Sequence, residues 1–536
     1  MLIVGFKPGH DGGMAVIRDG HLLYSLESEK DSFFRYSPLT PATVLEIAER
    51  LDALPDVVAV GGWQEGHIPV ATGYHGTDPG IMRTGRFFGK DVAYFSSSHD
   101  RSHILGAIGM APPGHHHKQQ AVLVWEGLTG AFFLVDDTHR VVKRVGVMND
   151  PGGKYAAIFA ILDPDFPVER ATLRYGDAGK LMALAAYADA RDADEEIRDA
   201  VDRVLAIATV HPVPKKDFRD TVLFDAGVTS QVGVLAAAVI TERIFTLFAE
   251  VAERELPAGL PLRISGGCGL NCEWNRQWRD LGHFTDVFVP PCPNDSGSAI
   301  GTAIDAQAAL TGEHHIDWNV YSGLDFITDA TPDPSRWRHR GLDHGAVAAA
   351  LASGRVFAWV QGRWEIGPRA LGNRSLLADA QSSSSKDRLN QIKQREDYRP
   401  IAPAARTEDL ASAFDTDFDD PYMLYFRRVR DQRLAAVTHV DGTARVQTVS
   451  RQMNPALHQL LSAVAERQGV GVLCNTSLNF SGYGFINRMS HLVAYCEGRG
   501  VTDMVVGGDW YEDMAKGESV TALAAEHSVL WHDGQP

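Results

Sequence analysis

The chain has 536 residues and a net charge of −17, with 44% hydrophobic and 22% charged residues, so it is too long for one ordinary core and we expect two or three domains. Its acidity argues against a protein that tracks nucleic acid, and no apolar run approaches the roughly 20 residues of a membrane span. The opening MLIVGF also lacks the pattern of a signal peptide. We therefore expect a cytoplasmic protein without nucleic-acid or membrane partners.

The first 26 residues predict a β-hairpin followed by another strand, with His10 and Asp11 on a glycine-rich turn. Residues 54–63 predict a further strand. Residues 121–146 then repeat the opening pattern: an apolar strand, an acidic-glycine turn, and two more strands. This repetition indicates an internally duplicated α/β fold of the actin-like ATPase kind, in which phosphates lie between the two turns.

Residues 179–207 and 229–255 predict helices from their apolar spacing. The stretches 261–271 and 287–297 each read as a strand, a turn and the start of a helix. Such turns leave backbone N–H groups that can face phosphate. Gly266-Gly267 and the stretch Gly176–Lys180 are therefore candidate nucleotide loops, with ordinary strand–helix turns as the alternative.

A stretch rich in Pro, Asp and Gly at 312–345 predicts a domain boundary, which divides the chain into 1–335 and 345–536. The second domain is expected to begin with a helix at 345–353. A polar linker is predicted at 381–388 and a buried strand at 469–479.

His99 and His103 form an HxxxH pattern, which on a helix puts both imidazoles on one face within reach of one ion. Glu126 and Asp295 are candidate carboxylate ligands at strand or turn ends. A chance pair of histidines is the alternative. The run His115–His117 lies in a Pro/Gly loop and is interpreted as solvated surface.

The five cysteines are odd in number, which argues against a disulfide framework. A zinc site usually needs paired knuckles, which Cys268, Cys272 and Cys292 do not supply. Reduced thiols are the favoured interpretation.

The densest functional signal lies in the second domain, where arginine, lysine, asparagine and serine gather beside Gly-Pro and Asn-Thr-Ser turns. These stretches are 365–375, 393–400, 443–448 and 475–479. Arginine offers bidentate donors to phosphate or carboxylate, and lysine adds a point charge. We predict a site for a small anion, with a solvated charged face as the alternative.

Nine motifs, in this order, resemble those of the O-carbamoyltransferases of nodulation-factor and antibiotic biosynthesis, the NodU/CmcH family. They are HDGG, HxxxH, GDAGKLM, GGCGLN, PNDSGSAIG, EIGPRALGNRS, KQREDYRP, TARVQT and NTSLN, and they cover residues 6 to 490. The opening and VLVWEG look most similar to cephamycin-type members, which favours an antibiotic acceptor over a nodulation factor.

The resemblance implies an α/β protein with two domains. The N-terminal one is an actin-like ATPase fold similar to tRNA threonylcarbamoyl transferases, and the C-terminal one is YrdC-like. The latter would make carbamoyl adenylate from ATP and carbamoyl phosphate. The former would pass the carbamoyl group to a hydroxyl of a small-molecule acceptor of cephem, macrolide or aminoglycoside type. Expected cofactors are Mg²⁺ with ATP and a divalent metal of the Fe²⁺ type; a homodimer is left open.

Residue by residue, the resemblance implies His10 as the general base, oriented by Asp11. His99, His103 and Asp295 would hold the metal, and Glu126 stands where the family usually has Asp, which leaves that ligand open. The residues implied for nucleotide in the N-terminal domain are Gly176, Lys180, Gly266, Gly267 and Asn271. Those implied for carbamoyl phosphate and ATP in the C-terminal domain are Arg369, Lys393, Arg399, Arg445, Asn475 and Ser477.

Three other functions are weighed. An actin-fold kinase or ATPase would leave the arginine-rich domain without a task, and a non-catalytic nucleotide-binding protein would show no turnover. Threonylcarbamoylation of tRNA fits poorly with the acidic chain and the fused domains. Acceptor contacts are expected from a variable loop at 64–95.

Overall fold

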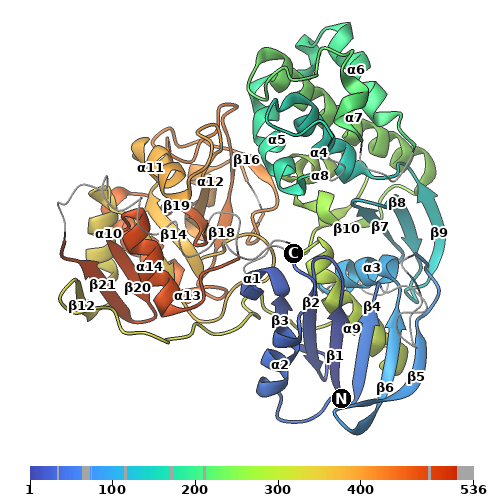
Figure 1. Ribbon diagram of the computed structural model, residues 1–536, viewed down its shortest axis with the longest axis horizontal. Helices are drawn as coiled ribbons and strands as arrows, with labels where there is room; N and C mark the ends of the chain where they lie inside the picture. The colour runs from blue at the N-terminus through green and yellow to red at the C-terminus, as the bar shows by residue number, and fades with distance from the viewer. Residues whose placement is uncertain are drawn as a thin grey trace.

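The computed structural model describes residues 1–32, 36–62, 73, 75–113, 118–169, 173–208, 213–416, 418–480 and 484–515. Three large sheets organise them (Figure 1). Two sheets and a group of helices come from the first part of the chain. The third sheet, with its own helices, comes from the last part and lies to one side.

The first sheet has the strand order β3-β2-β1-β4-β6-β5. Its strands are β1 (Leu2–Lys7), β2 (Gly13–Arg18), β3 (His21–Glu27), β4 (Val57–Gly61), β5 (Ile81–Phe87) and β6 (Lys90–Ser97). The first three strands pair antiparallel, whereas β4 pairs parallel with β1 and β6 parallel with β4. The short helices α1 (Ser28–Ser32) and α2 (Pro41–Arg50) follow β3.

The second sheet repeats this arrangement in the order β11-β10-β7-β8-β9. Its strands are β7 (Gln120–Trp125), β8 (Gly130–Val135), β9 (Val141–Gly146), β10 (Pro261–Ser265) and β11 (Asp286–Phe288). Again three strands pair antiparallel, and β10 and β11 extend the sheet in parallel. The predicted duplicated α/β fold is confirmed, because the two sheets share this strand order and these strand directions.

Two buried helices, α3 (His99–Gly109) and α9 (Ser298–Thr311), pack against each other between these sheets. Their close crossing depends on glycine, since a Cβ on Gly301 would lie 1.8 Å from the carbonyl oxygen of Ser102. The crossing brings the N-terminal ends of both helices to the same region, where the predicted metal ligands lie.

A group of helices covers the second sheet (Figure 1). They are α4 (Pro151–Leu162), α5 (Ala178–Leu184), α6 (Glu195–Leu205), α7 (Gln231–Glu255) and α8 (Cys272–Asp280). Among the described residues, α7 is the one helix long and apolar enough to cross a membrane, but 67% of its most apolar window is buried inside the protein. It packs against α4, α5 and α6, and this packing accounts for its apolar composition.

The third sheet has the order β12-β21-β20-β13-β14-β19-β15-β18. Its strands are β12 (Trp337–Gly341), β13 (Phe357–Val360), β14 (Arg374–Asp379), β15 (Ala402–Arg406), β18 (Gln447–Val449), β19 (Val472–Ser477), β20 (Asp503–Val506) and β21 (Asp509–Asp513). The accompanying elements are α10 (His344–Ala352), α11 (Ser384–Lys393), α12 (Leu410–Ala413), α13 (Pro455–Gln468), α14 (Met489–Arg499) and the small pair β16 (Phe426–Arg428) and β17 (Thr443–Arg445). The strand β12 lies between the two predicted domain ranges and pairs within this sheet.

Two local predictions are wrong. Residues 384–388, predicted within a polar linker, begin α11, whose Leu389 is buried. Residues 81–95, predicted within a variable loop, form most of the hairpin β5–β6. Nearly all side chains of β5 are exposed, so the strand carries no apolar alternation that would announce it. Residues 63–72, 74 and His115–His117 lie outside the described residues.

Candidate functional site

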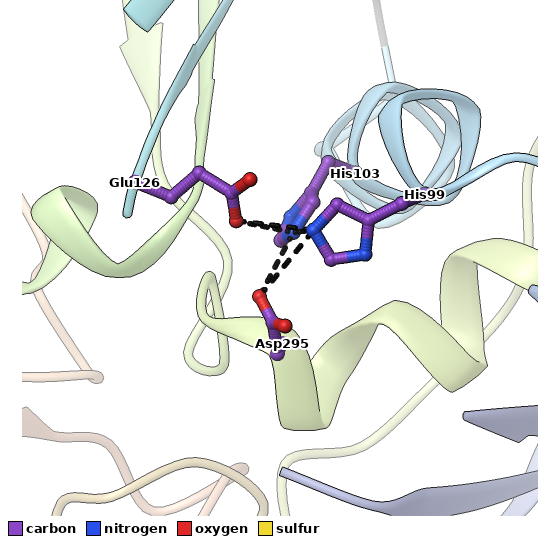
Figure 2. Close-up of side chains that lie close together, drawn as sticks. All are labelled: His99, His103, Glu126 and Asp295. Carbon is purple, nitrogen blue, oxygen red and sulfur yellow. Dashed lines mark hydrogen bonds and ion pairs between the residues drawn. The ribbon is translucent and has the colours of Figure 1, made fainter. Parts of the chain in front are cut away.

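Four side chains predicted as metal ligands meet at one point (Figure 2). His99 and His103 come from the first two turns of α3, Glu126 follows β7, and Asp295 starts the short turn before α9. Nε2 of His99 lies 3.1 Å from Glu126 Oε2 and 3.1 Å from Nε2 of His103. We call these residues the four-ligand cluster; Glu126, which the resemblance left open as a ligand, lies within it.

The cluster fits a divalent cation in size and chemistry. Asp295 Oδ1 lies 3.3 Å from His103 Nε2 and 3.6 Å from His99 Nε2, and His103 Nε2 lies 3.3 Å from Glu126 Oε2. Four ligands held tetrahedrally about 2.0–2.2 Å from an ion are separated by about 3.3–3.6 Å. Nitrogen and carboxylate donors of this kind suit first-row transition metals.

A hydrogen-bond relay fixes the tautomer of His103. Its Nδ1 lies 2.8 Å from the hydroxyl of Ser265, which itself donates to the carbonyl oxygen of Pro293 at 3.3 Å. The hydroxyl therefore accepts from Nδ1–H, and Nε2 keeps its lone pair for a cation. Hydrogen-bond partners of this kind commonly orient metal-binding histidines.

The cluster requires positive charge. Burial lowers the pKa of His103, but hydrogen bonds to Asp295 and Glu126 outweigh this effect and raise it to about 10. Burial opposes ionisation of Asp295, yet the neighbouring imidazoles and Lys7 hold its pKa well below the usual range. Two buried carboxylates thus attract either a proton or a metal cation to the same place.

The turn after β1 brings His10 beside this cluster. Its Nδ1 lies 3.0 Å from Asp11 Oδ2 and 3.9 Å from Asp295 Oδ2. Asp295 and Asp11 together raise the pKa of His10, and burial raises the pKa of Asp11 to about 7. Gly12 is required here, because a Cβ would lie 2.1 Å from the backbone nitrogen of Leu39.

Lys7 was missed by sequence reasoning. Its Nζ donates to the carbonyl oxygen of His10 at 2.6 Å and lies 3.4 Å from Asp295 Oδ2, and its residue is only 4% exposed. The available signal was a lysine that ends an otherwise apolar strand. Lys7 thus contacts both the turn that carries His10 and the carboxylate of Asp295.

The residues predicted to contact nucleotide in the N-terminal domain lie near the second sheet and have visible structural roles. Gly266 has φ of 93° and would clash with Trp125 if it carried a Cβ, and Asn271 caps α8. Gly176 lies in a short 3-10 turn before α5, and Gly267 faces open space. Their contact with nucleotide stays a prediction.

Lys180 forms ion pairs with two carboxylates, one in the helical group and one in the unit of the third sheet. Its Nζ lies 3.0 Å from Asp177 Oδ1 and 2.9 Å from Glu396 Oε1, which belongs to the stretch between α11 and β15. The lysine therefore connects the helical group to the third-sheet unit. Its predicted role as a nucleotide ligand stays a prediction.

The predicted C-terminal residues include a crowded group of cations, in which Lys393 is buried and the arginines are half-buried. Burial and mutual repulsion lower the pKa of Arg369 to about 9, with Arg445 and Arg399 as the repelling neighbours. Burial, Arg399 and Arg445 likewise lower the pKa of Arg395 to about 9, and burial together with Arg395 and Arg399 lowers that of Lys393 strongly. These five residues, which we call the basic cluster, crowd positive charge and so attract an anion. Arg395 lies within the KQREDYRP motif, and its part in this cluster was missed by sequence reasoning.

Polar residues surround the basic cluster. Lys393 Nζ donates to the Ser477 carbonyl at 2.6 Å, and Asn475 Nδ2 donates to Gln447 Oε1 at 2.8 Å. Arg369 Nη2 donates to the carbonyl oxygen of Leu270 at 2.9 Å. Since Leu270 closes the Gly266-Gly267 turn, the basic cluster faces the second sheet across the junction of the two units.

Family comparisons match both parts of the chain. The family described as Carbamoyltransferase N-terminus matches residues 80–304, and the one described as Carbamoyltransferase C-terminus matches residues 348–512. Among solved structures, the activator of the 2-hydroxyisocaproyl-CoA dehydratase from Clostridium difficile with bound ADPNP shows 13% identity and a TM-score of 0.35, covering 58% of this chain and 97% of that one. This likeness is too weak to add to the topology.

Curated relatives match nearly the whole chain. The 3'-hydroxymethylcephem-O-carbamoyltransferase of Streptomyces clavuligerus is 61% identical over 96% of this chain and 100% of its own length. The protein of the same name from Amycolatopsis lactamdurans is 60% identical over 96% and 99%. Nodulation protein U of Sinorhizobium fredii is 32% identical over 93% and 98%. The resemblance seen in the motifs is confirmed, and the chain belongs to the carbamoyltransferase family of enzymes.

Proposed function

We propose that this protein is an O-carbamoyltransferase that carbamoylates the hydroxymethyl group of a cephem. The observation that carries the proposal is the 61% identity along the full length of a 3'-hydroxymethylcephem-O-carbamoyltransferase. Among the acceptor classes that the motifs left open, this identity favours a cephem over a macrolide or an aminoglycoside.

In the first half-reaction, carbamoyl phosphate loses its phosphate to water, and the resulting carbamate oxygen attacks the α-phosphorus of Mg²⁺-bound ATP. Pyrophosphate leaves, and carbamoyl adenylate forms. The basic cluster supports this assignment, because its crowded guanidinium and ammonium groups suit phosphate oxygens. Ser477 lies beside it, with its carbonyl oxygen accepting from Lys393, and Asn475 donates to the carbonyl oxygen of Ala370, the neighbour of Arg369.

In the second half-reaction, the acceptor hydroxyl attacks the carbamoyl carbon and AMP leaves. With Nδ1 of His10 turned to Asp11 at 3.0 Å, Nε2 is the nitrogen that takes the hydroxyl proton. Asp11 and Asp295 then stabilise the imidazolium that forms. Lys7 supports the same arrangement by holding the His10 carbonyl oxygen.

The four-ligand cluster would hold a divalent cation, which when bound supplies a Lewis acid for a phosphate or carbamoyl oxygen. That this cation is iron stays a prediction from the resemblance. We assign transfer to residues 1–335 and adenylate formation to residues 345–536, and a YrdC-like character of the second range stays part of the same proposal.

The test uses the purified protein with ATP, Mg²⁺, Fe²⁺, carbamoyl phosphate and a 3-hydroxymethylcephem, with products identified by mass spectrometry. We expect acceptor heavier by one carbamoyl group, together with AMP and pyrophosphate. An acceptor heavier by one phosphoryl group would instead identify a kinase, and intact ATP in every mixture would identify a non-catalytic binding protein.

Two variants assign the half-reactions. Arg399→Ala should abolish pyrophosphate release in the absence of acceptor, whereas His10→Ala should keep that release and lose the transfer. Arg433→Ala is the matched control, because Arg433 is an exposed arginine paired with Asp431. Equal losses in Arg399→Ala and the control would contradict the assignment.

A further inference from the structure

The imidazole of His10 lies against a tyrosine. Tyr36 stacks on it with ring centroids 5.4 Å apart and an interplanar angle of only 4°. The His10 side chain is 56% exposed, so the tyrosine covers one face of a ring that otherwise lies largely open to solvent. The contacts of Nδ1 with Asp11 and Asp295 set the direction in which the His10 ring points. The stacking on Tyr36 sets the orientation of the ring plane.

The backbone holds Tyr36 in this place. The Asp11 amide donates to the Tyr36 carbonyl at 3.3 Å, the Gly12 amide to the Ser37 carbonyl at 2.8 Å, and the Leu39 amide to the Pro8 carbonyl at 3.0 Å. These three hydrogen bonds join the segment 36–39 to the histidine turn. Tyr36 also has φ of 60°, a left-handed conformation that a non-glycine residue adopts at a cost. Tyr36 therefore has an unfavourable backbone conformation at the same position where its ring stacks on His10.

A second tyrosine supports the first. The ring of Tyr175 meets Tyr36 edge-on, with centroids 6.4 Å apart and an angle of 80°. Tyr175 begins the short turn that carries Gly176 and is 41% exposed. His10, Tyr36 and Tyr175 therefore form an aromatic row from the first sheet to the helical group.

We propose that Tyr36 is a positioning residue for His10 in carbamoyl transfer, an inference that rests on the proposed function. Its ring holds the imidazole plane so that Nε2 meets the acceptor hydroxyl while Nδ1 stays on Asp11. The same π face stabilises the imidazolium formed when His10 takes the hydroxyl proton. Tyr36 acts through His10 and breaks no bond itself.

The test measures transfer in a single turnover, in which protein, ATP and carbamoyl phosphate are premixed before the cephem is added. For Tyr36→Leu we expect the maximal transfer rate to fall about tenfold or more, because misplaced catalytic groups cost rates of this order. The half-saturating acceptor concentration and acceptor-free pyrophosphate release should stay within about twofold of wild type. Tyr36→Phe keeps the ring and should restore the transfer rate.

Tyr511→Leu is the matched control, because Tyr511 stacks on His339 at 5.0 Å in the third sheet. This variant should transfer the carbamoyl group at the wild-type rate. In a His10→Ala background, Tyr36→Leu should cause no further loss of the residual slow transfer measured over long incubation, since the two residues act as one unit. If Tyr36→Leu does not fold, Tyr36→Met carries the same comparison.

Several results would overturn the proposal. An unchanged transfer rate in Tyr36→Leu would remove the positioning role. A raised half-saturating concentration at an unchanged maximal rate would make Tyr36 an acceptor contact instead, and an additive loss in the His10→Ala background would separate it from His10. A wild-type protein that transfers nothing would refute the proposed function itself, which distinguishes that failure from the others.

Discussion

Asp295 joins the four-ligand cluster to His10. One of its oxygens, Oδ1, lies 3.3 Å from His103 Nε2, and the other, Oδ2, lies 3.9 Å from His10 Nδ1. One carboxylate, only 14% exposed, therefore faces both an imidazole of the cluster and the proposed base. A change at Asp295 should alter cation binding and proton transfer together, whereas a change in the basic cluster should alter neither.

Asp295→Asn tests this relationship. The amide cannot supply the negative charge that the cluster uses, so we expect bound metal to fall by at least about tenfold and carbamoyl transfer to fall with it. Pyrophosphate release without acceptor should persist, because the basic cluster is untouched. Metal is measured by elemental analysis of the dialysed protein. Glu126→Asp, which keeps a carboxylate at that position, is the control that should keep both metal and transfer.

Arg395→Met should have opposite effects on stability and on binding. Removing one of several mutually repelling cations should leave the melting temperature of the ligand-free protein unchanged or higher, although the hydrogen bond from Arg395 Nε to Asn390 Oδ1 at 2.7 Å is lost. The rise in melting temperature that carbamoyl phosphate gives wild type should shrink or vanish. Thermal unfolding with and without carbamoyl phosphate measures both effects. Arg433→Met should keep the full ligand response, and a full response in Arg395→Met would contradict an anion site.

Local pattern was sufficient where the partners of a residue lie within one turn or strand. The HxxxH spacing fixed His99 and His103 on one helical face, and both carboxylates predicted with them reached the same point. The repeated strand–turn–strand pattern likewise gave two sheets of matching order. In these cases, short-range geometry determines which side chains can meet.

Pattern failed where partners come from distant segments. Lys180 lies in a glycine-rich stretch, but nothing in that stretch indicates its ion pair with Glu396, more than two hundred positions later. Lys7 contacts Asp295 only because the fold places the turn before α9 beside the end of β1. The strand β5 has no buried face to produce alternation, and only its pairing with β6 makes it a strand. Tertiary contacts of this kind override local propensity.

Glu27→Gln should destabilise the junction between the first and third sheets. Glu27 Oε1 accepts from Lys30 Nζ at 2.7 Å and from the Gly367 amide at 2.7 Å, and both ionic side chains are almost fully buried. Removing the charge of one partner leaves a buried cation, which costs about 3–5 kcal/mol. Urea and thermal unfolding should show this loss, and the paired change Glu27→Gln with Lys30→Met should recover part of it.

An exposed ion pair provides the control for that change. Asp220 pairs with Arg203 at 2.8 Å, but the two side chains are 71% and 46% exposed. Asp220→Asn should therefore leave the melting temperature nearly unchanged. An equal effect of Asp220→Asn and Glu27→Gln would show that burial at the junction adds nothing.

Asp420 should make stability depend on pH. Burial raises its pKa from 3.8 to about 6, although the amides of Leu424 and Tyr425 donate to it and oppose the shift. The folded protein therefore holds this proton more tightly than the unfolded chain does. The resulting stabilisation is complete below pH 3.8 and is lost as the pH rises through about 6. Its size is on the order of 3 kcal/mol.

Asp420→Asn removes this titration and isolates its contribution. The amide keeps one acceptor oxygen for the Leu424 or Tyr425 amide and stays neutral at every pH, so the variant should gain stability relative to wild type as the pH rises from 4.5 to 7.5. Melting temperatures at the two pH values give the comparison. The neighbouring Asp419 is exposed. The difference in melting temperature between Asp419→Asn and wild type should therefore be the same at both pH values. Parallel pH profiles for wild type and Asp420→Asn would mean that water or a nearby cation solvates the carboxylate in the folded protein, and burial would then not be its dominant environment.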